Sequence, residues 1–446
     1  MLRNLGFGLL AALFVAGGAK AEPVSSFTLD NGMQIVVIED HRAPVVVQMV
    51  WYRIGSADEP AGHSGIAHFL EHLLFKATDD MEAGAFSEAV SAQGGRDNAF
   101  TSYDFTAYYQ RVAADRLDLV MGMEADRMRD LLLTEEDVVT ERQVILEERN
   151  QRTDSSPGAL LNEQMSAAQF LNHPYGVPVI GWRHEMEALS RDDALAFYRA
   201  NYAPNNAILI VAGDVTPDAV LEMAQKHYGP VAPSNDIKPR IRPQEPPQLA
   251  ARRLVMTDER VSEPYVLRSY LAVERNPGDQ RQAAALLLLA EVLGGSSTTS
   301  VLARALQFDS QVAVYSSAFY NPTSVDPDTF SLVVQPQPGV SLSEAEAALD
   351  GVVTKFLDTG IAAADFERIK AQLRAEDVYD RDNTEGLAQR YGTALAVGLT
   401  LDDIAEWPKL LQEVTADEVM AAARAVFQDQ TSVTAWLQAT EEGAEP

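Results

Sequence analysis

Two histidines and a glutamate stand close together in the stretch His68-Phe69-Leu70-Glu71-His72. The surrounding residues 65–75 contain no proline and favour a helix. Because residues four apart lie on one helix face, His68 and His72 can present both imidazoles to one metal ion, with Glu71 beside them. A hydrolytic zinc site combines such imidazoles with a carboxylate and an open position for water. Zinc lowers the pKa of that water, and Glu71 would remove its proton as general base.

The same motif can also arise by chance on a solvated helix. If it does bind a metal, a third ligand has to come from another part of the chain. Residues 135–149 predict a helix rich in carboxylates, where Glu141 and Glu148 are two helical turns apart and share a face. Glu147 lies about 100° away from that face. Spacing alone does not choose between Glu147 and Glu148, and a surface helix with Glu–Arg pairs would contain the same residues.

The order of predicted elements repeats along the chain. Strand patterns at 27–29, 33–38, 45–52, 98–101, 104–112 and 206–211 alternate with helical patterns at 65–75, 84–93, 114–132 and 135–149. A second series has strands at 254–256, 265–272, 311–319, 329–334 and 432–437, with helices at 281–293, 343–357, 363–379, 384–397 and 416–427. This order predicts a duplicated α+β fold, each half a mostly antiparallel sheet packed against helices.

The sequence divides into five parts. Residues 1–21 have a short basic start, an apolar core and an Ala19-Lys20-Ala21 cleavage pattern, which predict a signal peptide. An N-terminal zinc-binding domain at 22–228 follows, then a proline-rich linker at 229–250, a homologous C-terminal domain at 251–440 and an acidic tail at 441–446. We expect export to a bacterial periplasm. No later apolar run reaches membrane-spanning length, so no stable membrane insertion is expected after signal removal.

The overall charge and the lack of cysteine exclude several kinds of partner and bond. The formal net charge of −30 repels nucleic acid and anionic lipid, so we expect no nucleic-acid partner. Without cysteine there are no disulfides, and the apolar cores alone must stabilise the exported chain.

With these residues in view, the chain resembles the pitrilysin or insulinase family of zinc peptidases, whose metal motif is His-x-x-Glu-His. The opening turn Leu29-Asp30-Asn31-Gly32 and the approach His63-Ser64-Gly65-Ile66-Ala67 also resemble that family. Its ligand glutamate stands at a distance that falls on Glu148, 76 residues after His72. The resemblance implies one Zn²⁺ per chain, held by His68, His72 and Glu148. Glu141 resembles a catalytic-site glutamate that orients the ligands.

The resemblance also suggests residues that contact a substrate. Residues 94–101 resemble an edge strand where Asn98 and the Ala99 backbone would pair with an extended peptide, although an ordinary hairpin strand is the alternative. In the second half the family uses an arginine and a tyrosine against the scissile carbonyl. The candidates here are Arg304, Tyr315 and Tyr320. None aligns cleanly, because Ser300-Val301-Leu302 stands where relatives often have Ser-Arg-Leu.

The predicted function is that of a zinc-dependent endopeptidase acting on unstructured peptides or exposed protein termini. The imperfect second half suggests a homodimer, or a heterodimer with a metal-less family member that completes the site. The alternative is a non-catalytic peptide-binding or assembly subunit of such a heterodimer. The intact Glu71 argues against it, because a pure binding site needs no general base.

Overall fold

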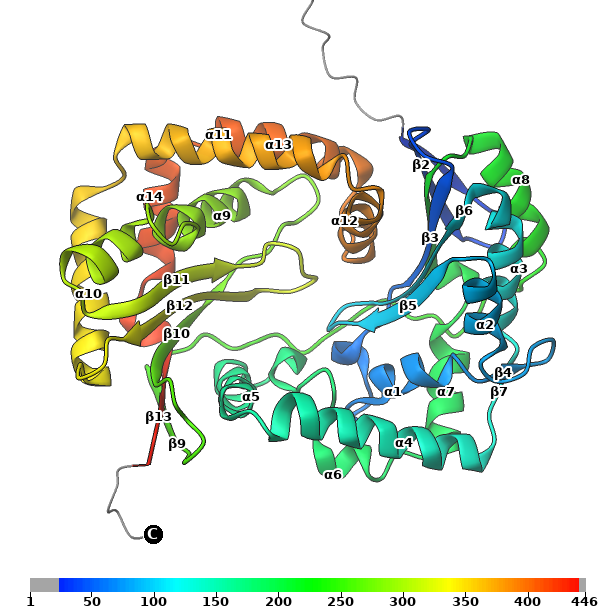
Figure 1. Ribbon diagram of the computed structural model, residues 1–446, viewed down its shortest axis with the longest axis horizontal. Coiled ribbons are helices and arrows are strands. Elements are labelled where there is room, and N and C mark those ends of the chain that lie inside the picture. The colour runs from blue at the N-terminus through cyan, green and yellow to red at the C-terminus, as the bar shows by residue number, and fades with distance from the viewer. Residues whose placement is uncertain (1–23, 441–446) are drawn as a thin grey trace, which may run out of the picture.

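The computed structural model describes residues 24–440. Two α+β halves lie side by side, joined by a long extended segment (Figure 1). The predicted signal peptide and acidic tail lie outside the described residues. Within 24–440, no helix combines the length and the apolar character needed to cross a membrane.

The first half contains a six-stranded sheet in the order β1-β2-β8-β3-β6-β5, in which β2 and β8 run parallel and the other neighbours antiparallel. Its strands are β1 (Val24–Thr28), β2 (Gln34–Glu39), β3 (Val45–Tyr52), β5 (Arg96–Thr101), β6 (Thr106–Ala113) and β8 (Ala207–Gly213). The helices of this half are α1 (Ile66–Leu73), α2 (Ala85–Ala92), α3 (Leu117–Arg127), α4 (Glu135–Arg149), α5 (Pro157–Gln169), α6 (Arg183–Met186), α7 (Arg191–Asn201) and α8 (Pro217–His227).

The second half has the same plan with one strand fewer. Its sheet has the order β11-β12-β10-β13-β9, so five strands correspond in order and direction to β5-β6-β3-β8-β2. This confirms the predicted duplicated α+β fold. The elements are β9 (Arg252–Thr257), β10 (Tyr265–Ala272), α9 (Arg281–Gly294), β11 (Ala313–Tyr320), β12 (Asp328–Pro336), α10 (Leu342–Thr359), α11 (Ala363–Asp380), α12 (Thr384–Ala396), α13 (Leu401–Glu413), α14 (Ala416–Val426) and β13 (Ser432–Gln438).

The two halves exchange one helix each. From the second half, α12 packs Leu387 and Leu395 against the face of the first sheet that carries Trp51. From the first half, α5 packs Leu161 and Met165 against β13 of the second sheet. A fully buried leucine or methionine contributes about 1.5–3 kcal/mol, so each half stabilises the core of the other.

The segment from 228 to 251 forms neither helix nor strand, yet it is anchored between the halves. The buried Arg242 guanidinium lies 2.6 Å from Oδ1 of Asp104 and 2.9 Å from Oδ1 of Asp58, both in the first half. It also lies 3.0 Å from Oδ2 of Asp326, in the turn between β11 and β12. Removing one partner of a buried charge cluster is costly, so this arginine ties the two halves together.

One predicted helix is shorter in the structure than the sequence pattern indicated. The pattern at 114–132 predicts a single helix, but α3 ends at Arg127. The Tyr198 hydroxyl donates to the Arg127 carbonyl and accepts from the Leu131 amide. Residues 131–132 then form the short strand β7, paired with β4 (Ala77–Thr78). A tertiary contact therefore ends the helix where local periodicity would continue it.

Candidate metal centre

The helix that carries the motif begins at a position where the backbone needs glycine. Gly65 precedes α1 with φ of +85°, and a Cβ there would lie 2.5 Å from the Ile180 carbonyl oxygen. The Glu59 carboxylate accepts hydrogen bonds from the amides of Gly65 and Ala67, at 2.9 and 2.8 Å. A carboxylate at this end satisfies free amides and complements the helix dipole. The start of α1 is thereby fixed.

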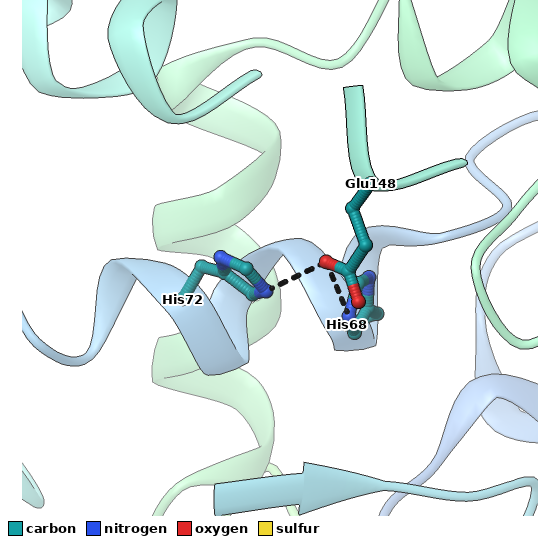
Figure 2. Close-up of side chains that lie close together, drawn as sticks. All are labelled: His68, His72 and Glu148. Carbon is teal, nitrogen blue, oxygen red and sulfur yellow. Dashed lines mark ion pairs between the residues drawn. The ribbon is translucent and has the colours of Figure 1, made fainter. Parts of the chain in front are cut away.

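The apolar face of α1 determines where its polar side chains point. Phe69, Leu70 and Leu73 are fully buried in the core of the first half. His68 and His72 are four residues apart, so they share one side of the helix. That side packs against α4. Figure 2 shows both imidazoles on that side, with the Glu148 carboxylate from the end of α4 reaching between them.

His68, His72 and Glu148 together form a group that could hold a metal ion. Each offers one ligand atom, and these atoms all lie within 4.8 Å of one another. Glu148 Oε2 lies 3.6 Å from Nε2 of His68 and 3.3 Å from Nε2 of His72 (Figure 2). The Glu147 side chain is exposed instead and accepts a hydrogen bond from Nε2 of the Gln151 side chain at 2.9 Å. The packing of α4 against α1 thus brings Glu148, and not Glu147, to the two histidines.

Glu141 lies directly behind His72. Its Oε1 is 2.9 Å from Nδ1 of His72, and its Oε2 is 2.6 Å from Nζ of Lys76. A carboxylate on Nδ1 leaves Nε2 of the same ring free for a metal and fixes the orientation of the imidazole. Burial acts to lower the pKa of His72, but the bonds to Glu141 and Glu148 outweigh it and raise the pKa to about 9.

The environment of His68 differs from that of His72. Burial, with a smaller contribution from the nearby charge of His72, lowers the pKa of His68 to about 4. Its Nδ1 is buried and has no hydrogen-bond partner among residues 24–440. Of the two imidazoles, His68 is therefore held neutral, in the form that binds metals.

Glu71 links the metal centre to the sheet. Its Oε2 accepts a hydrogen bond of 2.6 Å from the Thr101 hydroxyl at the end of β5. Burial raises the pKa of Glu71, although this hydrogen bond and the charge of His72 oppose the shift. A carboxyl at this position can accept a proton from a neighbouring group and return it. The arrangement thus suits a general base beside the metal group.

Asn98 and Ala99 lie on β5, which forms one edge of the first sheet. β5 pairs with β6 on one side, and no strand of the described residues pairs with its other side. The Ala99 amide donates to Oδ1 of Asn98 at 2.9 Å, and the Asn98 side chain is exposed. An unpaired edge can accept an extended peptide as a further strand.

The three second-half candidates lie apart from the metal group. Arg304 forms an ion pair with Asp365 at 2.6 Å. The Tyr320 hydroxyl donates to the Val273 carbonyl, and Tyr315 is partly exposed on β11. None of the hydrogen bonds or ion pairs found within 24–440 connects these three residues to the metal group or to Glu71.

Three residues of the centre were not predicted from the sequence: Lys76, Thr101 and Arg152. Lys76 contacts Glu141, Thr101 contacts Glu71, and Arg152 contacts Glu148. Arg152 follows Glu148 by four residues on a continuing helical segment, a spacing that signals a side-chain pair. The Lys76 and Thr101 contacts join separate elements and carry no local signal.

Comparison with known proteins places the chain in a family. A sequence model described as "Insulinase (Peptidase family M16)" matches residues 34–182, and one described as "Peptidase M16 inactive domain" matches 188–373. Together they match well over half of the chain. The chain belongs to the insulinase family of peptidases, family M16, which confirms the resemblance seen in the sequence.

Individual relatives agree with this assignment. The chain is 29% identical to "Zinc protease PqqE" of Helicobacter pylori, over 97% of this chain and 98% of that protein. A crystal structure of a protease from Helicobacter pylori matches with a TM-score of 0.87 and 28% identity, covering 94% of this chain and all of that one. The periplasmic protease PqqL from Escherichia coli shares the fold at 18% identity, with a TM-score of 0.79 over 94% of this chain and 48% of that chain. Further relatives are also named zinc proteases.

The residues of the centre fit the zinc that these relatives' names imply. Two imidazole nitrogens and one carboxylate oxygen converge, and three such protein ligands are typical of catalytic zinc sites. Glu141 behind the His72 imidazole and Glu71 beside the metal group complete the arrangement.

Proposed function

We propose that this chain is a zinc-dependent endopeptidase that hydrolyses unstructured peptides or exposed protein termini. The observation that carries the proposal is the position of Glu71. This one carboxyl stands beside His68 and His72 on α1 and is hydrogen-bonded to Thr101, at the end of the open edge strand. A peptide pairing with β5 would therefore run past the general base.

Each residue of the metal centre has a distinct part in the proposed reaction. Zinc held by His68, His72 and Glu148 would supply a Lewis acid that polarises a peptide carbonyl and makes water more acidic. Glu71 takes a proton from the attacking water and delivers it to the amine that leaves. Glu141 keeps the His72 ring oriented throughout.

The open edge of β5 supports a substrate without regular structure. A strand added there binds mainly through backbone hydrogen bonds, which every extended peptide offers. Asn98 and the Ala99 backbone are the contacts expected on this edge. Folded proteins would have to expose a terminus or loop to reach it.

We also propose where the protein acts and how it assembles. Residues 1–21 support export to a bacterial periplasm, and the similar fold of a periplasmic protease agrees with it. Since no hydrogen bond or ion pair found within 24–440 joins Arg304, Tyr315 or Tyr320 to the metal group, we propose a homodimer, or a heterodimer with a metal-less relative, that supplies the remaining substrate contacts.

Cleavage of a quenched, unstructured peptide by the chain from Glu22 onward tests the proposal, with Glu71→Gln as the matched variant. Glutamine retains an oxygen for the Thr101 hydrogen bond but cannot accept the proton. We expect unchanged zinc content and a loss of cleavage of about 10²–10⁴-fold. Zinc binding and peptide binding without cleavage by the wild type, even with a family partner added, would favour the non-catalytic binding subunit.

A further inference from the structure

The two oxygens of the Glu148 carboxylate have different partners. Oε2 faces the imidazoles of His68 and His72, at 3.6 and 3.3 Å. Oε1 lies 2.5 Å from Nη1 of Arg152. This ion pair brings two opposite charges into close contact, so the guanidinium is attracted to Oε1. The carboxylate is therefore presented to the metal group with one oxygen already engaged.

Arg152 differs from the neighbouring arginines in what it contacts. Arg149 is buried and bonded to Glu163 and the Gly181 carbonyl, and Arg183 pairs with Asp154 and Glu187. The Arg152 side chain is 75% exposed, and Glu148 is its one hydrogen-bonded or ion-paired partner within 24–440. An exposed ion pair adds little to folding stability, so stability alone does not account for this contact.

The backbone conformation places the guanidinium at this position. Directly after α4, residues Asn150–Asp154 form a π-helical turn, closed by the Ser155 amide donating to the Asn150 carbonyl at 2.9 Å. Such wider turns are uncommon and occur frequently at functional sites. The turn begins two residues after the ligand Glu148 and contains Arg152, whose guanidinium lies against the outer oxygen of Glu148.

We infer that Arg152 is a positioning residue that holds Glu148 as a single-oxygen metal ligand, an inference that rests on the proposed zinc peptidase function. A carboxylate can bind a metal through one oxygen or two. A second oxygen would occupy a coordination position that water and the peptide carbonyl need in a catalytic site with three protein ligands. With Oε1 ion-paired with Arg152, Oε2 is the oxygen left for the metal.

Cobalt(II) substituted into the full mature chain reports this coordination, because its visible absorption is several-fold weaker when five-coordinate than when four-coordinate. The variants are Arg152→Gln, Arg152→Lys and, as a control, Lys409→Gln. Lys409 is an equally exposed cation in an i,i+4 pair with Glu413, remote from the centre. We expect weaker absorption in Arg152→Gln, about a tenfold lower kcat at unchanged KM, and substantial recovery in Arg152→Lys. Lys409→Gln should match the wild type.

The outcomes separate this inference from the proposed function. A four-coordinate spectrum in Arg152→Gln equal to that of the wild type would overturn the role of Arg152 and leave the peptidase proposal intact. A changed spectrum in a chain that binds metal yet cleaves no peptide would support the role of Arg152 and count against the peptidase. If the wild type bound no metal, both would be wrong.

Discussion

The two halves of the molecule share a framework but not its chemistry. In the first half α1 packs against α4 and α7, and in the second half α9 packs against α11 and α14, which follow in the same order along the chain. The inner positions of α9 are apolar, mostly alanine and leucine, and all seven histidines of the chain lie in the first 227 residues. A duplicated fold therefore needs its apolar core in both copies, whereas the metal group depends on a few side chains in one.

The largest difference between the halves should appear in metal binding. Glu148→Gln removes the carboxylate from the group formed with His68 and His72, and we expect bound zinc to fall from one ion per chain to nearly none. Glu291→Gln alters the half-buried carboxylate of α9, the counterpart of α1, and should leave zinc content unchanged. Metal analysis after dialysis checks both variants. Loss of zinc in Glu291→Gln would show that the second half also holds metal.

A smaller effect is expected from the residue behind the ligands. Glu141→Gln removes the charge that faces His72 and Lys76, so the imidazole is less firmly oriented. We expect zinc affinity to fall by about 10–100-fold, measured by competition with a chelating dye. Glu136→Gln, an exposed change on the same helix, is the control. Equal affinities for the two variants would contradict the orienting role of Glu141.

Because α12 of the second half packs on the first sheet, a substitution at this contact should change the stability of the protein and not its metal binding. A Cβ at Gly392 of α12 would lie 2.0 Å from the Trp51 ring, so Gly392→Ala should lower the free energy of unfolding by about 1–3 kcal/mol. In α10, Gly351 faces open space, and Gly351→Ala should stabilise slightly. Thermal unfolding of the two variants measures the difference. A Gly392→Ala protein as stable as the wild type would mean that α12 does not pack on the first sheet.

Much of the local structure could be predicted from the sequence. The pattern at 135–149 coincides with α4, and the motif at 65–75 contains α1. Helices α5, α6, α7, α8 and α13 were not predicted. α13 contains Pro408, and the buried side of α5 faces the sheet of the other half, so neither is evident from local composition.

The sequence by itself determined that two imidazoles and a carboxyl share one helix, because a spacing of four residues is a local property of the α-helix. It also indicated the repeated series of main strands in the two halves and, through the family resemblance, favoured Glu148 as the third ligand. Only the tertiary structure brought Glu148 and Arg152 to that helix, left β5 as an open edge and exchanged α5 with α12. These outcomes depend on how buried faces pack between elements far apart in the chain, which no local pattern contains.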